Sequence, residues 1–374
     1  MNHQKIAMYL PSLEGGGAER VFVQLANEFV SQGICVDFLL VAARGPYYEE
    51  LSSSVRCIDF NSSGVLASLQ HLIRYLRTER PHVIISGLDH ANIVTILACM
   101  FSDIPIRCVI SVRSVPTAIY REVRSIRRWI ILQIMKMMYR FADVIIVNSK
   151  YGAEDLVRSF YLAQQKLKVI YNPLDLDNIR RLSKMPAEHP WCVPGSPPII
   201  LGVGSLSVLK DFQTLIRAFS IIRSIRDCRL VILGEGPDRE RLEFLISQLG
   251  LQDDVYLPGF VRNPFPWMLN AKVFVCSSLT EGCPNALMQA LACGTPVVST
   301  DCHAGAMEIL EKGKWGRLVP SGCPEAMSDA ILDSIDVPSP PEVQRRASHF
   351  QIKDIAQQYL DVLLPGFSRS CKDN

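Results

Sequence analysis

The pattern of apolar and polar positions divides the chain into short β-rich runs that alternate with longer amphipathic stretches. The runs of the first half are apolar on both faces, which is typical of parallel strands buried beneath helices. They cover residues 5–10, 35–42, 82–87, 107–113, 143–149 and 168–173. Residues 18–33, between the first two runs, have helical spacing and end in glycine. This alternation predicts a doubly wound α/β domain.

The alternation stops in a segment rich in proline and polar residues and then restarts, which predicts a second α/β domain. Its apolar runs cover residues 198–206, 228–236, 254–260, 272–278, 295–301 and 316–320. We expect an N-terminal domain at 1–175, a linker at 176–196, a C-terminal domain at 197–340 and a closing segment at 341–374. In this last segment residues 343–364 have helical spacing and could pack back on the N-terminal domain. Two such domains facing each other leave a cleft lined by strand carboxyl ends and helix N-termini.

Composition agrees with a folded two-domain protein. The chain has 374 residues, which is too long for one ordinary core. Of these residues 48% are hydrophobic and 20% are charged, a composition that argues against disorder. Up to residue 185 there are 22 Lys and Arg against 16 Asp and Glu, and the remainder has 17 against 21. The first half would therefore favour an anionic partner, although scattered surface charge gives the same count. We expect no nucleic-acid partner.

The cysteines and the apolar runs bear on the compartment. The twelve cysteines have no paired C-x-x-C spacing, and several lie in apolar runs, so we interpret them as core residues of a reducing compartment rather than metal ligands. No apolar run reaches the roughly 18 residues of a membrane-spanning helix. We expect a cytoplasmic protein, peripheral on the inner face of the cytoplasmic membrane.

Three glycine- or lysine-bearing corners between strands and helices are candidates for binding an anion. At Gly15, Gly16 and Gly17, bare backbone N–H groups could meet a phosphate or sugar, or the glycines could form a plain flexible turn. Lys210 precedes a helix whose expected N-cap is Asp211, where a lysine can reach a phosphate, although a surface lysine is the simpler interpretation. The turn at 234–237 fits a structural role better.

A fourth corner carries the isolated acid Glu281. Pro284 suits the first helical turn, so Glu281 lies just outside the helix, where backbone N–H groups near Asn285 and Ala286 can hold an anion. A carboxylate beside an anion site repels the anion unless the carboxylate faces a different group. The hydroxyls of a sugar would be such a group, because the carboxylate can accept their hydrogen bonds while the helix end holds the phosphate. The alternative is that Glu281 only caps its helix.

The run from Thr280 to Asp301 resembles the E-x7-E region of retaining nucleotide-sugar glycosyltransferases of family 4, which have the two-domain GT-B fold. The segments "GGGAERV", "LKDFQTLIRAF", "VILGEGPDRERLE", "LPGFVRNPFPWMLNAKVFVCSS" and "GRLVP" follow in the family's order, so the resemblance covers nearly the whole chain. It is similar above all to bacterial enzymes that extend lipid-linked glycans or other surface polysaccharides.

The resemblance implies a role for each matching residue. It implies that Glu281 meets the hydroxyls of the donor sugar, that Lys210 meets the diphosphate and that the loop at 262–264 lies beside the base. The donor-binding residues that it implies are Gly15, Gly16, Gly17, Ser205, Lys210, Gly234, Arg262, Asn263, Pro264, Glu281, Gly282, Cys283, Pro284, Asn285, Ala286, Leu287 and Gln289.

The sequence departs from the family pattern at three positions. Gln289 stands where the family has the second acid of E-x7-E. Its amide oxygen can accept a hydrogen bond from one ribose hydroxyl, but its NH2 group cannot accept from the other, so the ribose contact should be weaker or rearranged. Ser205 stands where many members have arginine, which leaves more of the diphosphate charge to Lys210. Arg113 lies in the loop where many members have histidine; it could replace the hydrogen bonds, and we count it with Glu281 and Lys210 as catalytic, but it cannot act as a base.

The resemblance implies a retaining hexosyltransferase that uses a UDP-sugar and needs no cofactor. We expect no D-x-D acid pair in the chain, which agrees with a diphosphate site that needs no metal ion. Positioning and charge stabilisation would then supply the catalysis. Three alternatives stay open: a GT-B-like sugar-nucleotide 2-epimerase, a glycoside hydrolase, which would need a second carboxylate, and a non-catalytic nucleotide-binding relative. The sequence does not name the sugar, the acceptor or the linkage.

Residues 121–140 predict a basic amphipathic helix. Six residues are basic and one is acidic, and Trp129 with several Ile and Met residues supplies an apolar surface. A buried domain helix with solvated arginines is the alternative. We expect this helix to dock on the anionic inner leaflet, with Arg124, Arg127, Arg128 and Arg113 near the diphosphate of a polyprenyl-diphosphate-linked acceptor.

Overall fold

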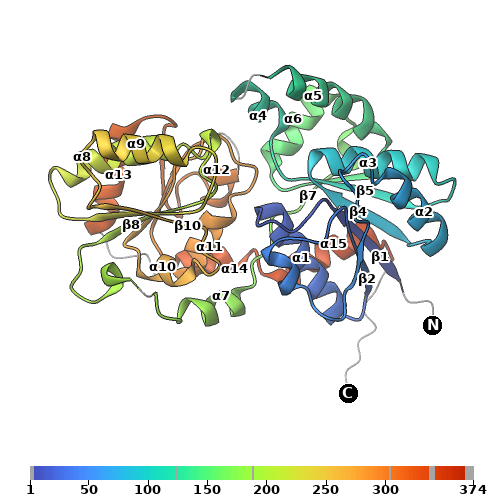
Figure 1. Ribbon diagram of the computed structural model, residues 1–374, viewed down its shortest axis with the longest axis horizontal. Coiled ribbons are helices and arrows are strands. Elements are labelled where there is room, and N and C mark those ends of the chain that lie inside the picture. Colours follow the sequence, from blue (N-terminus) through green and yellow to red (C-terminus); the bar gives the residue numbers. More distant parts are fainter. Residues whose placement is uncertain (1–3, 123–124, 188, 303–304, 337–341, 367–374) are drawn as a thin grey trace. The chain divides into compact units, whose positions relative to one another are not determined.

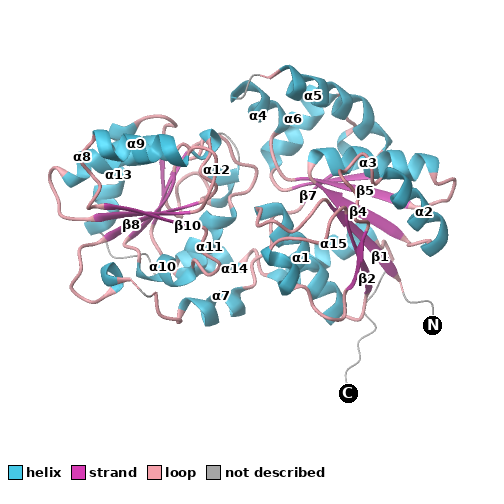
Figure 2. Cartoon of the chain, in the orientation of Figure 1, coloured by secondary structure: helices cyan, strands magenta, loops and turns pink. Residues whose placement is uncertain are grey.

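The structure is a computed structural model that describes residues 4–122, 125–187, 189–302, 305–336 and 342–366. Its first unit consists of Met1–Pro173 and Ile352–Asn374, and its second unit of Leu174–Gln351. In each unit a parallel sheet is covered by helices on both faces (Figure 2). The predicted fold class, two doubly wound α/β domains, is confirmed.

A seven-stranded parallel sheet with the order β3-β2-β1-β4-β5-β6-β7 forms the centre of the first unit. Alternate residues of β1 face opposite sides: Ile6 and Met8 belong to one hydrophobic cluster, and Ala7 and Tyr9 belong to another. Because all four are fully buried, the strand reads as apolar throughout. The strands are β1 (Lys5–Leu10), β2 (Cys35–Leu40), β3 (Arg56–Asp59), β4 (Val83–Gly87), β5 (Arg107–Val112), β6 (Val144–Val147) and β7 (Leu167–Val169).

The helices of the first unit form one layer on each face of this sheet (Figure 1). Helices α1 and α15 share a hydrophobic cluster with β1 and β2, whereas α5 and α6 share a different cluster with the opposite faces of β5 and β6. The helices are α1 (Gly17–Ser31), α2 (Leu69–Glu79), α3 (Asp89–Phe101), α4 (Pro116–Glu122), α5 (Ile126–Met138), α6 (Lys150–Phe160) and α15 (Ile352–Leu363), with short 3-10 turns η1 (Pro46–Glu50), η2 (Tyr139–Phe141) and η3 (Gln164–Lys166).

The second unit is built on a six-stranded parallel sheet with the order β10-β9-β8-β11-β12-β13. The strands are β8 (Ile199–Val203), β9 (Arg229–Leu233), β10 (Val255–Gly259), β11 (Val273–Cys276), β12 (Val297–Thr300) and β13 (Arg317–Val319). The helices are α7 (Leu176–Ser183), α8 (Phe212–Arg223), α9 (Arg239–Gln248), α10 (Phe265–Asn270), α11 (Asn285–Cys293), α12 (Gly305–Ile309), α13 (Pro324–Asp336) and α14 (Val343–Ser348), with η4 (Pro190–Cys192) and η5 (Val208–Lys210).

Three predicted segments differ in the structure. Residues 176–196, expected as a linker, contain α7 and η4, and α7 packs on α10 and α11 within the second unit. The expected helix 343–364 is two helices, α14 in the second unit and α15 in the first. The expected helix 121–140 is the end of α4 followed by α5 and η2, and Arg124 lies outside the described residues.

No helix in the described part of the chain is both long and apolar enough to cross a bilayer. The cysteines that the structure describes are free, and most of those in the second unit are buried. Burial alone raises the pKa of Cys293, which lies in α11, to about 12, so this thiol stays protonated and packs as a small apolar residue.

Candidate active site

The candidate site lies at the point where the strand order of the second sheet reverses. Strands β8 and β11 are neighbours at the centre of that sheet, and the chain leaves them in opposite directions, toward β9 and toward β12. In doubly wound sheets, ligands bind in the crevice outside the carboxyl ends of two such strands. Lys210 follows β8 and Glu281 follows β11, so the topology brings these two predicted residues to the same place.

The carboxylate of Glu281 is the centre of the site. Its Oε1 forms an ion pair and hydrogen bond with Nζ of Lys210, and it also accepts a hydrogen bond of 2.9 Å from Oγ of Ser278. The side chain of Glu281 is 13% exposed and that of Lys210 is 27% exposed. Both charges are therefore largely shielded and held in place, but they remain reachable from solvent.

A set of buried polar contacts fixes the two loops. Oγ of Ser277 donates to the carbonyl of Lys210 at 2.7 Å, and the amide of Leu279 donates to the carbonyl of Leu209 at 2.9 Å. Oγ1 of Thr300, at the end of β12, donates to the carbonyl of Ser278 at 2.5 Å. These hydrogen bonds join the loops after β8, β11 and β12, so the Lys210–Glu281 pair sits on a rigid support.

The polar residues of this support did not figure in the sequence prediction. Ser277, Ser278 and Thr300 are each at most 2% exposed. The signal was present, because polar residues that directly follow apolar strands cluster at the carboxyl edge of a parallel sheet.

The pKa of Lys210 is raised above its ordinary value. Burial is the largest single influence and acts to lower it, but the carboxylate of Glu281, Cys276 and Cys302 together outweigh burial. Lys210 is therefore a cation at neutral pH. A buried cation beside the end of a helix can stabilise negative charge on a ligand.

Helix α11 begins immediately beyond the acid. Pro284 is its N-cap residue in an extended conformation, and Asn285 and Ala286, which are half-buried, form its first turn. As predicted, Glu281 lies outside the helix and does not cap it. The backbone of Gly305 lies so close that an added Cβ would approach the carbonyl oxygen of Gly282 to 2.1 Å, which explains the glycine at position 305.

The other predicted donor-site residues of the second unit have varied surroundings. Gln289 is buried on α11. Asn263 is held by its own unit, because its Nδ2 donates to the carbonyl of Leu182 at 3.1 Å, whereas Arg262 is exposed. Ser205 is exposed, and its hydroxyl lies 3.3 Å from that of Ser207. Gly234 has a positive φ, and an added Cβ would lie 1.9 Å from the carbonyl oxygen of Gly204, so this position requires glycine.

The glycine corner of the first unit is not bare. Oε2 of Glu19 accepts hydrogen bonds from the amides of Gly15 at 2.8 Å and Gly16 at 2.7 Å. The sequence prediction had these amides available to an anion. In the structure the chain supplies its own anion, because a carboxylate in the first turn of α1 folds back onto the loop.

Arg113 follows β5 and is engaged within the first unit. Its Nη1 donates to Asn172 at 2.6 Å, its Nη2 donates to the hydroxyl of Tyr359 at 2.9 Å, and its guanidinium lies over the rings of Phe22 and Tyr359. These contacts join β5 to α15 and α1. Arg113 therefore has a clear structural task, whatever else it contacts.

The expectation that the chain holds no acid pair of D-x-D spacing was wrong. Asp175 and Asp177 have this spacing, but each already has a partner: Asp175 caps α7 by accepting from the amide of Asn178 at 3.0 Å, and Asp177 pairs with Arg180. Across the described residues, no group of three or more His, Cys, Asp or Glu side chains is placed to hold a metal ion.

Comparison with known proteins identifies both halves of the chain. The family model described as Glycosyltransferase Family 4 matches residues 15–178, and that described as Glycosyl transferases group 1 matches residues 197–336. An N-acetylgalactosamine-N,N'-diacetylbacillosaminyl-diphospho-undecaprenol 4-alpha-N-acetylgalactosaminyltransferase of Campylobacter jejuni is 30% identical over 96% of this chain and 100% of that protein. An uncharacterized glycosyltransferase of Methanocaldococcus jannaschii is 31% identical over 73% of this chain and 65% of that protein, so this match leaves about a third of that protein unmatched.

The fold is also found in solved structures. The crystal structure of Anabaena HepE in complex with UDP-glucose superimposes with a TM-score of 0.82 at 20% identity, covering 96% of this chain and 99% of that chain. At this level of identity the likeness shows the fold, which is the GT-B class that the sequence predicts.

Proposed function

Since the chain belongs to the family 4 glycosyltransferases, we propose that it transfers a sugar from a UDP-sugar to a lipid-linked glycan acceptor, with retention of the anomeric configuration. The observation that carries this proposal is the pairing of Lys210 with Glu281 at the switch point of the second sheet. The Anabaena protein whose structure holds UDP-glucose supports UDP as the carrier. The diphospho-undecaprenol in the name of the Campylobacter jejuni relative supports a lipid-linked acceptor in cell-surface polysaccharide synthesis.

The pair gives each charge a separate task in this proposal. Ser278 and Lys210 both bond to Oε1 of Glu281, so Oε2 is the oxygen that accepts hydroxyl protons of the donor sugar. The ammonium of Lys210 also attracts the negatively charged diphosphate. Glu281 holds this ammonium in position before the donor arrives, so no reorganisation is needed during the reaction.

The leaving group is stabilised by charge rather than by a side-chain acid. As the bond between the sugar and the diphosphate breaks, negative charge grows on the diphosphate oxygens, beside Lys210 and the N-terminus of α11. The acceptor hydroxyl attacks from the same face, and the departing diphosphate takes its proton. This scheme requires no metal ion and no catalytic base.

The remaining donor contacts follow from the family pattern. Gln289 takes one ribose hydroxyl, and the loop at Arg262, Asn263 and Pro264 lies beside the base. Ser205 adds a hydroxyl near the diphosphate, where it cannot contribute charge.

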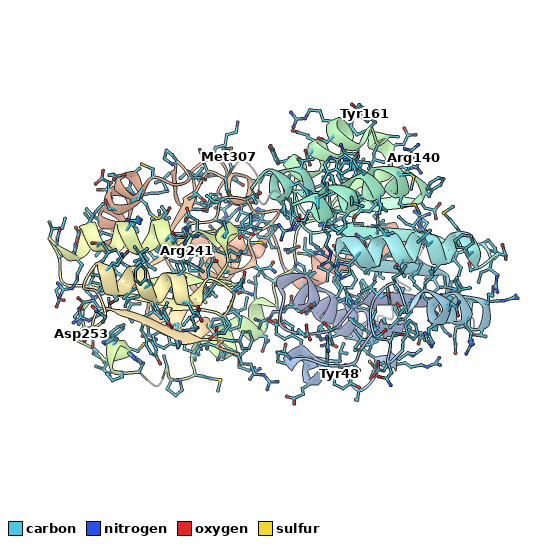
Figure 3. All side chains as sticks on the ribbon, turned by 45° about the horizontal axis from the view of Figure 1, so that its top comes forward. Tyr48, Arg140, Tyr161, Arg241, Asp253 and Met307 are labelled. Atoms are coloured by element: carbon cyan, nitrogen blue, oxygen red, sulfur yellow. The ribbon has the colours of Figure 1, made fainter. Side chains whose placement is uncertain are left out.

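The proposal of a lipid-linked acceptor is also supported by the surface of α5. One face of this helix packs in the domain core through Leu132, Met135 and Met138, so the buried-helix interpretation holds for half of it. The other face is apolar and exposed: Ile126 is 74% exposed and Trp129 is 57% exposed. This exposed face consists of Ile126, Trp129, Ile130, Ile134 and Met137. Arg127 and Arg140 are exposed beside it, and Figure 3 shows Arg140 at the periphery of the first unit. Exposed apolar and basic side chains together fit an anionic lipid surface.

A transfer assay tests the enzymatic proposal. The protein is incubated with membrane extract and one radiolabelled UDP-sugar at a time, in excess EDTA, and lipid-extractable label is counted. We expect label from one sugar. Turnover of the sugar nucleotide without extract would favour the epimerase, and UDP binding with no transfer to any extract would favour the non-catalytic relative. Loss of transfer in EDTA that Mg²⁺ or Mn²⁺ restores would overturn the metal-free scheme.

Flotation with liposomes tests the membrane surface. Wild-type protein should float with vesicles that contain anionic lipid, and binding should weaken with salt. Changing Arg127 and Arg128 to Glu removes two cations worth about 1 kcal/mol each, so affinity should fall at least roughly 30-fold. The matched control changes Arg217 and Arg241 of the second unit to Glu and should float like wild type. Equal flotation of both variants, or none by wild type, would show that the acceptor is reached in another way.

A further inference from the structure

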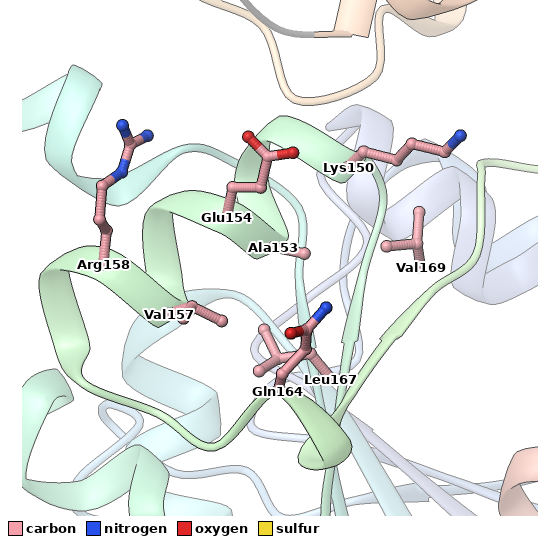
Figure 4. Close-up of a pocket in the computed structure, with 8 residues that line it drawn as sticks. All are labelled: Lys150, Ala153, Glu154, Val157, Arg158, Gln164, Leu167 and Val169. Carbon is pink, nitrogen blue, oxygen red and sulfur yellow. The ribbon is translucent and has the colours of Figure 1, made fainter.

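A trough separate from the candidate active site lies in the first unit, between α6 and the edge strand β7 (Figure 4). Its volume is about 560 Å³, within the range of about 300–1,000 Å³ that is usual for small-molecule sites. It is lined by Lys150, Ala153, Glu154, Val157, Arg158, Gln164, Leu167 and Val169. None of the donor-site residues named above belongs to it.

The floor of the trough suits a hydrocarbon. Ala153 and Val157 from α6, and Leu167 and Val169 from β7, point into the space between the two elements (Figure 4). None of the eight lining residues is aromatic, so a nucleobase would find no ring to stack on. A flexible aliphatic chain would bury its surface here by the hydrophobic effect.

The rim of the trough is charged, and the charge has a direction. Lys150 and Arg158 are cations two turns apart on α6, and Glu154 lies between them, so the rim carries a net single positive charge. Lys150 stands in the first turn of α6, at the carboxyl edge of the sheet, where the helix dipole adds positive potential. Gln164 and Leu167 lie at the opposite end. An anionic head therefore belongs at Lys150, and its tail belongs toward Leu167.

The trough borders the hydrophobic cluster into which the inner face of α5 packs, because Leu167 belongs to this cluster and Ala153 and Val157 pack against it. Helices α5 and α6 pack into the same hydrophobic cluster, through Met135 and Met138 of α5 and Leu156 and Phe160 of α6. We propose that the α6–β7 trough holds the first isoprenoid units of the polyprenyl diphosphate of the acceptor, with the diphosphate beside Lys150. This inference rests on the proposed function, because it assumes a lipid-linked acceptor.

The probe that tests this inference is geranylgeranyl diphosphate, a twenty-carbon isoprenoid diphosphate. Its direct binding to the protein is measured below the concentration at which the probe forms micelles. Wild-type protein should bind this probe and should bind inorganic diphosphate or geranylgeraniol at least tenfold more weakly. Val157→Trp fills the trough and should weaken binding at least tenfold. Lys150→Glu, a change on the surface that does not endanger folding, should weaken it severalfold.

Two controls match these variants. Lys168→Glu reverses an exposed charge on β7 outside the lining, and Ala163→Trp adds the same bulk at an exposed position. Both should bind the probe within twofold of wild type. The inference is overturned if wild type does not bind the probe, if Val157→Trp binds like wild type, or if Lys168→Glu weakens binding as much as Lys150→Glu does.

UDP binding separates this inference from the proposed function. UDP should bind all of these variants equally, because the candidate donor site is in the second unit. Probe binding without UDP binding would overturn the proposed function and leave the trough assigned. Sugar transfer to a lipid-linked acceptor by a protein that does not bind the probe would overturn the trough alone.

Discussion

The corner after β1 and the corner after β11 have the same parts and different arrangements. Each joins a buried central strand to a helix through a glycine-bearing loop. The first corner carries two glutamates, Glu14, which pairs with Arg44, and Glu19, whereas the second carries Glu281. Glu19 lies inside the first turn of α1 and accepts from the amides of Gly15 and Gly16. Glu281 lies four residues before α11 and pairs with Lys210 from a different loop.

The difference shows that the position of a carboxylate relative to a helix start decides its task. Inside the first turn, the carboxylate reaches back to the loop and completes the hydrogen bonds of its own backbone. Several residues earlier it cannot reach these amides, and it must take partners from elsewhere. A residue of the second kind has its charge available to a ligand, and we assign the chemistry to the second corner for that reason.

The largest expected effect is on Glu281. Glu281→Gln should lower turnover about 10²–10³-fold, because it removes a charge that orients Lys210 and accepts sugar hydroxyls. The circular dichroism spectrum should not change. Glu240→Gln, at an exposed position on α9, is the matched control and should turn over like wild type. Wild-type turnover in a folded Glu281 variant would erase the distinction between the two corners.

An intermediate effect is expected at the other corner, and on stability instead of turnover. Glu19→Ala should lower the free energy of unfolding by about 1 kcal/mol, as for the loss of a capping side chain, because two amides lose their acceptor. Urea denaturation measures this change. Turnover of the remaining folded protein should stay near wild type. A loss of turnover as large as that of Glu281→Gln would mean that Glu19 faces a ligand after all.

The pH dependence of Glu19 sharpens the same point. Burial raises the pKa of Glu19 above its ordinary value of 4.5, although the amides of Gly16 and Gly15 oppose this. A raised carboxyl pKa favours the protonated form in the folded state, so the stability from this group is present below pH 4.5 and is lost as pH rises through the folded pKa. Glu19→Gln removes that loss. In urea denaturation, the free energy of unfolding of the variant should therefore rise relative to that of wild type between acid and neutral pH. Parallel plots of this free energy against pH for the two proteins would contradict the assignment.

The smallest expected effect concerns Gln289, on the helix that follows the acidic corner. Gln289→Glu should tighten UDP binding roughly threefold, because hydrogen bonds to a charged group are stronger than those to an amide. Calorimetry measures this affinity. Gln248→Glu, at an exposed position on α9, makes the same chemical change outside the site and serves as the control. Unchanged or weaker binding would place Gln289 in a different network.

The sequence predicts most of the fold because the strands are buried on both faces. Strand β1 has the predicted bounds, and every other predicted run contains a strand except 168–173, which overlaps only the end of β7 (Leu167–Val169). Strand β3 was not predicted because it is a short edge strand without an apolar run. Arg56 and Asp59 at its two ends are exposed. The position of Asp211 as the N-cap of α8 was predicted correctly from residue type alone.

The site was predictable in its parts but not in its contacts. Lys210 and Glu281 are 71 residues apart, and only the strand order that places β8 beside β11 brings them together. The reach of Glu19 depends on the path of a glycine loop, which has no signature in side-chain pattern. Tyr359, one of the hydrogen-bond partners of Arg113, lies 246 residues further along the chain, so the sequence around Arg113 could not name it.

The way in which the chain builds its first unit has a consequence for biogenesis. Helix α15 supplies Ile355, Tyr359, Leu360 and Leu363 to the same hydrophobic cluster as β1 and α1, although the whole second unit is synthesised between them. During translation, the second unit can close its core as soon as it emerges, whereas in the first unit the part of one sheet face that α15 covers beside α1 must wait. A chain truncated after residue 351 would therefore consist of a finished second unit tethered to an unfinished first one, a ready substrate for chaperones and proteases.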